Sequence, residues 1–132
     1  MPDETYRAMC MSLPRQGMVR GVHIVTGYQY IGHDRHKRIR RLLYDEIVRL
    51  STRGPGTSQC VIGADWNAEV GTRGEGDPAG RWTPILGPHG NKRRGQTGEA
   101  LLQVCEANDW VIAETFTPQR TEGTWFHPRF GS

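Results

Sequence analysis

An aspartate and an asparagine two residues apart, Asp65 and Asn67, follow a short apolar run at residues 60–62. The run is continuously apolar and bounded by polar residues, which predicts a strand buried on both faces. Ligands of α/β sheets bind beyond the carboxyl ends of central strands, so we expect both side chains to project into a site. A carboxylate there can bind Mg²⁺ or orient water, and a carboxamide can hold a phosphoryl oxygen. Aspartate and asparagine are also common turn residues after strands, and that alternative stays open.

The elements that must position this pair begin with a strand at residues 22–28, which is rich in β-branched residues and ends at Tyr28. Asp34 can cap a helix that runs to about Ser51 and is closed by the turn at residues 53–56. Apolar residues fall at helical spacing along this helix and are expected to face inward: Ile39, Leu42, Leu43, Ile47 and Leu50. Strand, helix and strand in this order indicate a mixed α/β fold.

After Asn67 the chain becomes rich in glycine, and residues 71–98 are expected to form a long surface loop. Thr97 can cap a second helix that ends near Asn108. Residues 110–113 are expected to form a strand, and residues 124–126 a further short one. Residues 1–21 have no clear period, so we expect a poorly ordered leader ahead of a single domain over residues 22–132.

Composition narrows the class of protein. With 132 residues, the chain has the length of one domain, and no apolar run approaches the ~20 residues that cross a bilayer. No secretory signal is recognisable, so we expect an intracellular protein, nuclear or cytoplasmic, without a membrane partner. Cys10, Cys60 and Cys105 are too widely spaced for a zinc site, and we expect reduced thiols, two of them facing the core.

The charge is unevenly distributed. The chain carries 17 basic and 14 acidic residues, a formal net charge of +3, and all the basic residues except Lys37 and Lys92 are arginine. Residues 20–53 hold 8 basic and 3 acidic residues, a local +5 that suggests a nucleic-acid partner. The predicted helix also begins with basic residues, the wrong sign for a helix N-terminus. A solvated helix face that tolerates this mismatch is the alternative.

Several motifs in order resemble the endonuclease/exonuclease/phosphatase superfamily, which includes deoxyribonuclease I and the endonuclease domains of non-LTR retrotransposons. Residues 61–71, Val-Ile-Gly-Ala-Asp-Trp-Asn-Ala-Glu-Val-Gly, resemble that family's strand and Gly-Asp-Phe-Asn-Ala-x-x-Gly signature. The strand at residues 22–28 resembles the one that ends in the family's active-site tyrosine. Residues 87–90 and 98–102 resemble a loop and helix of the retrotransposon branch, and Thr115-Phe116 and Thr124-Trp125 fit later elements.

The resemblance implies a fold, an activity and a set of site residues. The implied fold is a partial four-layer α/β sandwich, and the implied activity is Mg²⁺-dependent hydrolysis of phosphodiesters. We expect DNA as the substrate ahead of RNA, and phosphorylated lipids stay an alternative. Asp65 would orient the attacking water and Asn67 would contact the scissile phosphate, the two together offering the ligands for Mg²⁺. Tyr28 would donate a hydrogen bond to a phosphate oxygen or assist the leaving group, and Thr124 and Trp125 would line the nucleic-acid face.

The chain also departs from the family pattern. No segment before residue 22 matches the one that carries the family's metal-binding Glu, and Ser132 comes before the family's terminal Ser-Asp-His. We therefore expect a middle portion of the domain, incomplete at both ends, with little or no turnover of its own. A non-catalytic nucleic-acid-binding remnant and a truncated product without function are the alternatives, and the oligomeric state is not predicted.

Overall fold

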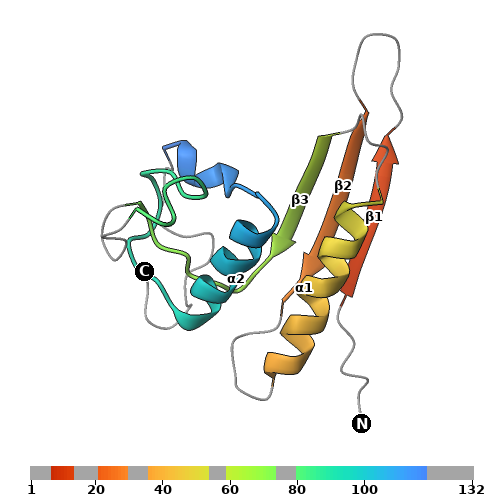
Figure 1. Ribbon diagram of the computed structural model, residues 1–132, viewed down its shortest axis with the longest axis horizontal. Helices are drawn as coiled ribbons and strands as arrows, with labels where there is room; N and C mark the ends of the chain where they lie inside the picture. Colours follow the sequence, from red (N-terminus) through yellow and green to blue (C-terminus); the bar gives the residue numbers. More distant parts are fainter. Residues whose placement is uncertain (1–6, 14–20, 30–35, 54–58, 74–79, 119–132) are drawn as a thin grey trace, which may run out of the picture. The chain divides into compact units, whose positions relative to one another are not determined.

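The structure, a computed structural model, describes residues 7–13, 21–29, 36–53, 59–73 and 80–118 (Figure 1). Its elements are β1 (Arg7–Leu13), β2 (Val22–Tyr28), α1 (Lys37–Ser51), β3 (Gln59–Asp65), α2 (Gln96–Ala107) and a short 3₁₀ helix, η2 (Ala113–Phe116). This content confirms the mixed α/β class. The chain divides into two compact units, Met1–Asn67 and Ala68–Ser132, where the sequence predicted one domain after a leader.

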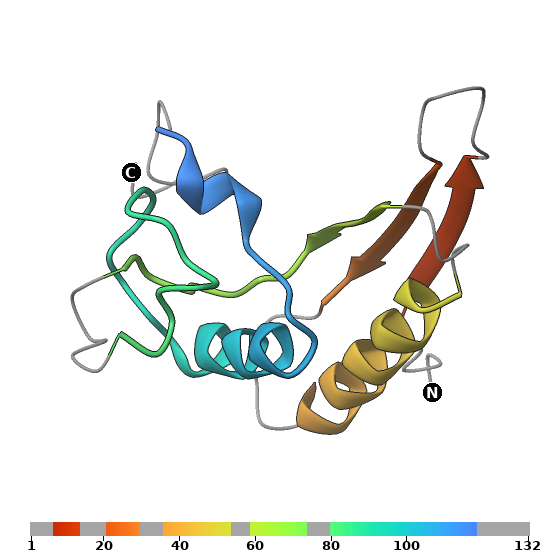
Figure 2. The ribbon, with the colours of Figure 1, turned by 45° about the horizontal axis from the view of Figure 1, so that its top comes forward.

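The first unit is built on a three-stranded sheet in the order β1-β2-β3. β1 runs antiparallel to β2, and β2 runs parallel to β3 in a register that pairs Val22 with Gln59 and Tyr28 with Asp65. Two parallel neighbours need a crossover connection, and α1 is that connection. Figure 2 shows α1 lying across one face of the sheet.

The core of this unit lies between α1 and the sheet. Helical spacing brings one stripe of α1 inward, and its buried residues are Ile39, Leu43, Tyr44, Ile47 and Leu50. Leu42, expected in this stripe, is 42% exposed, and Tyr44 takes the inward place. The helix begins at Lys37 with His36 as its N-cap residue, two positions after the expected Asp34 cap, and Asp34 itself lies outside the described residues.

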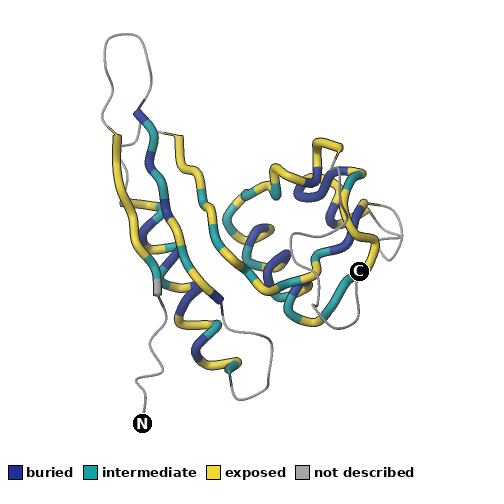
Figure 3. Tube along the Cα trace, turned by 180° about the vertical axis from the view of Figure 1, so that it is seen from behind, coloured by how far each residue is buried: buried dark blue, intermediate teal, exposed yellow. Residues whose placement is uncertain are grey.

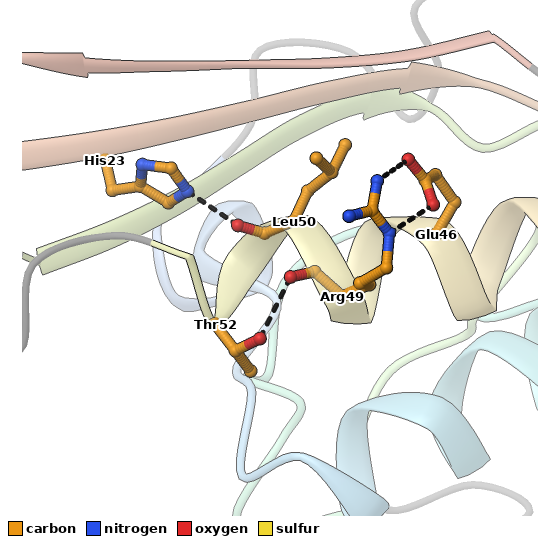
Figure 4. Close-up of polar contacts among 5 residues, drawn as sticks. All are labelled: His23, Glu46, Arg49, Leu50 and Thr52. Atoms are coloured by element: carbon orange, nitrogen blue, oxygen red, sulfur yellow. Dashed lines mark hydrogen bonds and ion pairs between the residues drawn. The ribbon is translucent and has the colours of Figure 1, made fainter.

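A buried histidine joins the sheet to the end of α1. His23 is 2% exposed, and its Nε2 donates to the Leu50 carbonyl at 2.7 Å (Figure 4). Its Nδ1 lies 2.7 Å from the Ser12 hydroxyl oxygen on β1. On the outer side of the same turn, Arg49 pairs with Glu46, and the Thr52 hydroxyl donates to the Arg49 carbonyl. The Leu50 carbonyl also accepts the Arg53 N–H at 3.2 Å, so backbone and side-chain donors together satisfy the carbonyls of the last helical turn.

The opposite face of the sheet is apolar and exposed within the described structure. Met9, Met11, Leu13 and Val61 are between 48% and 69% exposed, as Figure 3 shows along β1 and β3. The expectation of a doubly buried strand at residues 60–62 is therefore wrong. β3 lies at an edge of this sheet, and the described helix of this unit covers the other face.

The expected leader is also wrong for residues 7–13, which form β1. Apolar residues alternate at Met9, Met11 and Leu13, and the backbone pairs with the whole length of β2. This period of two was present in the sequence. The structure does not describe residues 1–6 and 14–20, so the prediction stays open there.

The second unit packs α2 against an irregular segment. α2 buries Leu101, Leu102 and Cys105, and Trp82, Ile85 and Leu86 are equally buried. The described parts of the expected surface loop, residues 71–73 and 80–95, have no helix or extended strand, yet the three apolar residues make this segment part of the core. The helix begins at Gln96 after Gly95, one residue before the expected Thr97 cap.

The strand expected at residues 110–113 does not form. The Trp110 N–H donates to the Cys105 carbonyl and the Ile112 N–H to the Ile85 carbonyl, so backbone bonds of this segment go to α2 and to the 80–86 segment. The 3₁₀ helix η2 follows at Ala113. Residues 124–126 lie outside the described part of the chain, and their predicted strand stays a prediction. Neither α1 nor α2 is long and apolar enough to cross a bilayer.

Gly98 on α2 is required by a close backbone approach. A Cβ at this position would lie 1.7 Å from the Glu69 carbonyl oxygen, a contact that no side-chain movement relieves. We predict that Gly98→Ala lowers the free energy of unfolding by at least about 1–3 kcal/mol in urea denaturation. The matched control is Gly95→Ser, where a Cβ would meet the Glu69 side chain at an ordinary 3.8 Å and a serine can cap α2. Equal stability of the two variants would contradict the close packing of α2 on residue 69.

The three thiols differ in burial. Cys10 and Cys60 are exposed and only Cys105 is buried, so the expectation of two core-facing cysteines is wrong by one. Burial raises the pKa of the Cys105 thiol to about 11, and burial also raises the pKa of Cys60. At pH 8 the Cys105 thiol therefore stays protonated and unreactive. We predict that iodoacetamide at pH 8 modifies Cys10 first and Cys105 only after denaturation, as peptide mass spectrometry can measure. Labelling of Cys105 as fast as Cys10 in the folded chain would refute this assignment.

Candidate functional site

The carboxyl ends of β2 and β3 bring two of the predicted site residues side by side. Tyr28 and Asp65 are the last residues of their strands and are register partners in the parallel ladder. Partners in one row of a pleated sheet project to the same face, here the face opposite α1. Both residues are exposed, and the Gln29 N–H extends the ladder with a 2.8 Å bond to the Asp65 carbonyl. The predicted proximity of Tyr28 and Asp65 is therefore present.

Asp65 and Asn67 are joined by a tight turn directly after β3. The Asn67 backbone N–H donates to Asp65 Oδ1 at 3.2 Å, and Asn67 has a φ of 43°, in the left-handed region. Asparagine tolerates this conformation better than most residues, and aspartate commonly accepts such a bond. Asp65 and Asn67 therefore do act as turn residues, the alternative that their sequence left open. The turn occupies one oxygen of the Asp65 carboxylate and leaves the other available to a ligand.

The Asn67 side chain ties this turn to the neighbouring strand. Its Nδ2 donates to the Gln29 carbonyl at 2.6 Å, so the carboxamide continues the bonding pattern where the ladder ends. One of the two amide hydrogens is thereby committed to the backbone. The oxygen of the same carboxamide is the atom whose chemistry suits a cation. Asn67 therefore makes a structural hydrogen bond and also carries the oxygen that the sequence predicted as a metal ligand.

A buried support lies behind the site, and the sequence did not reveal it. Gln29 is fully buried, and its Oε1 accepts a 2.6 Å bond from the hydroxyl of Tyr44 on α1. The Tyr44 ring packs at a tilt against Trp66, with ring centroids 5.9 Å apart. Gln29, which follows Tyr28, and Trp66, which precedes Asn67, are thus both in contact with α1. Tyr44 lies on the apolar stripe of the helix, but helical spacing alone does not indicate that its hydroxyl bonds Gln29.

Gln29 also holds an unsatisfied donor. Its Nε2 is buried and has no hydrogen-bond partner within the described part of the chain. A buried amide without a partner costs about 1–3 kcal/mol, so such groups usually bond an internal water or a ligand oxygen. This donor belongs to the residue whose backbone holds both Asp65 and Asn67.

The oxygens at this edge have the chemistry that Mg²⁺ prefers, but they are few. Asp65 offers a carboxylate and Asn67 a carboxamide oxygen, and across the described ranges no group of three or more His, Cys, Asp or Glu residues could hold a metal ion. Mg²⁺ keeps several waters and is commonly held by one or two carboxylates together with substrate phosphates. Asp65 and Asn67 fit such a hydrated ion when a phosphate also binds it. We expect weak Mg²⁺ binding when no phosphate is present.

The rest of the 61–71 motif belongs to the second unit. The Glu69 carboxylate lies 3.4 Å from Nε of Arg93, and the Glu69 carbonyl accepts the Gly95 N–H at 3.0 Å. Arg94 Nε donates to the Val70 carbonyl at 2.8 Å. These bonds hold residues 69–70 against the loop before α2. Thr124 and Trp125, predicted to bind substrate, lie outside the described residues.

Comparisons with protein-family models, with curated proteins and with solved structures find no match to this chain.

The double role of Asn67 gives a stability test. Asn67→Ala removes the bond to the Gln29 carbonyl and places a Cβ without polar compensation in the left-handed region, whereas Asn67→Gly removes the bond alone. We predict that the alanine variant is less stable than the glycine variant by about 1–2 kcal/mol in urea denaturation. Equal losses for the two variants would show that the left-handed turn does not persist in solution.

Proposed function

We propose that the chain is an endonuclease-like domain of the endonuclease/exonuclease/phosphatase type, which acts on DNA phosphodiesters with Mg²⁺. The observation that carries this proposal is the meeting of Tyr28, Asp65 and Asn67 at one edge of the sheet. The resemblance assigns these three positions to the reaction on sequence grounds. The register and the turn supply an independent, geometric reason to group them.

Each residue has a role that its chemistry permits. The outer oxygen of Asp65 orients a water for attack on phosphorus, as a positioned carboxylate can. The second hydrogen of Asn67 Nδ2, beyond the one given to the Gln29 carbonyl, donates to a phosphate oxygen, and the Tyr28 hydroxyl donates to another. Bound Mg²⁺ supplies stabilisation of the charge that develops on the phosphoryl group. Asp65 and Asn67 would hold it, and we expect slow turnover because the described site contributes one carboxylate.

The metal site can be tested without relying on turnover. We predict that substoichiometric Mn²⁺, used as a paramagnetic substitute, broadens the amide NMR signals of residues 65–67 and Gln29 first, and that excess Mg²⁺ restores them. Asp65→Ala should abolish this selective broadening. Asp45→Ala, which removes an exposed carboxylate from α1, should leave it unchanged. Broadening spread over all acidic residues, or retained in Asp65→Ala, would contradict the site.

The reaction is tested by nicking of supercoiled plasmid at high protein concentration. We expect slow cleavage that requires Mg²⁺ and falls by about 10²–10⁴-fold in Asp65→Ala, which is the usual contribution of a positioned acid–base group. Asp45→Ala is again the matched control. Mg²⁺-dependent nicking that survives in Asp65→Ala at the original rate would refute the role given to Asp65.

A non-catalytic nucleic-acid-binding domain is the second candidate. It is favoured by the basic first turn of α1, which has no acidic residue. This candidate predicts DNA binding that needs no metal and weakens steeply with salt. It would be the better description if plasmid nicking stays at background while DNA binding is retained.

A further inference from the structure

The first five residues of α1 include four basic ones, Lys37, Arg38, Arg40 and Arg41, and we call these four the α1 basic patch. Ile39, the fifth, is 6% exposed and packs into the core. Positive charge at a helix N-terminus opposes the helix macrodipole. The patch therefore weakens the helix that carries it.

The fold places this patch at the same edge of the first unit as the candidate site. α1 is the crossover between two parallel strands, so its first turn follows the carboxyl end of β2. Figures 1 and 2 show the start of α1 toward the arrowheads of β2 and β3, where Tyr28 and Asp65 end their strands. The patch and the candidate site therefore share one end of the first unit, with the patch on α1 and the side chains of Tyr28 and Asp65 on the face of the sheet opposite the helix.

Among the residues that the structure describes, the arginines of this patch have no structural partner. Arg38 and Arg41 are exposed and Arg40 is half-buried, and none of the three has an ion pair or hydrogen bond with the described residues. Three other arginines are paired with acidic side chains: Arg49 with Glu46, Arg81 with Glu106 and Arg93 with Glu69. Asp45 lies one turn beyond Arg41 and offsets one of the charges.

We propose that the α1 basic patch is a surface that binds the phosphate backbone of DNA at the end of the first unit that carries the candidate site. The guanidinium fork of arginine matches two phosphate oxygens, and arginines on successive turns of one helix form a rigid row of such groups. A lipid surface fits less well, because an interfacial helix inserts its apolar face and that of α1 is buried against the sheet. DNA as the ligand rests on the proposed function, whereas binding itself does not require catalysis.

The test is the salt dependence of binding to a short duplex, measured by fluorescence anisotropy with EDTA present. Each phosphate neutralised contributes about −0.9 to the slope of log K against log salt, so Arg38→Gln/Arg41→Gln should make the slope shallower by about 1.8. The matched control is Arg49→Gln/Arg81→Gln, which removes the same charge from residues already paired with carboxylates. It should change the slope by much less. Circular dichroism melts establish that both variants fold.

Equal effects of the two double variants would overturn the proposal, because binding would then follow net charge. It is also overturned if the chain does not bind DNA, or if it binds vesicles containing phosphatidylserine more tightly than DNA under the same conditions. Asp65→Ala separates this inference from the proposed function. If that variant keeps the patch-dependent DNA slope but the wild-type chain shows no selective Mn²⁺ broadening, the proposed function fails and the binding surface stands. If the wild-type chain shows selective Mn²⁺ broadening but the two double variants change the DNA slope equally, the metal site stands and the binding surface is overturned.

Discussion

The parallel register of β2 and β3 is the constraint on which the rest of the first unit depends. It sets Tyr28 beside Asp65, and the ladder continues by one bond from Gln29 to the Asp65 carbonyl. The Asn67 side chain can reach the Gln29 carbonyl only in this alignment. A shift of one residue would send Asp65 to the opposite face of the sheet. The same register requires a crossover, and α1 therefore begins beside the carboxyl edge.

The support behind the site joins these features to the core. Tyr44 comes from the buried stripe of α1, and its hydroxyl fixes the Gln29 carboxamide while its ring contacts Trp66. Packing of the helix on the sheet therefore determines where the strand ends lie. At the other end of α1, His23 bonds the Leu50 carbonyl and holds the helix to β2. Helix and sheet are fixed at both ends, so the candidate site rests on a rigid base.

Sequence reasoning predicted local features well and long-range features poorly. The strand at residues 22–28 and the helix ending at Ser51 follow from β-branched content and helical spacing, which neighbouring residues largely decide. The exposure of Val61 was missed because burial of a strand depends on what covers its faces, not on its own composition. Residues 110–113 have strand-forming side chains, yet their backbone bonds go to α2 and the 80–86 segment. The pairing of Gln29 with Tyr44 is likewise a long-range contact without a sequence signal.

The central claim is that Tyr28, Asp65 and Asn67 form one site for a metal ion and a phosphate, and that the turn made by Asp65 and Asn67 places these two side chains. A crystal structure of the full chain grown with Mn²⁺ and a short DNA duplex, examined by anomalous diffraction, tests this most directly. The account predicts a Mn²⁺ peak bonded to the Asp65 carboxylate, with a DNA phosphate oxygen among its remaining ligands. Occupied Mn²⁺ sites elsewhere, with Asp65 bonded only to the Asn67 N–H, would contradict it and leave these residues a purely structural turn.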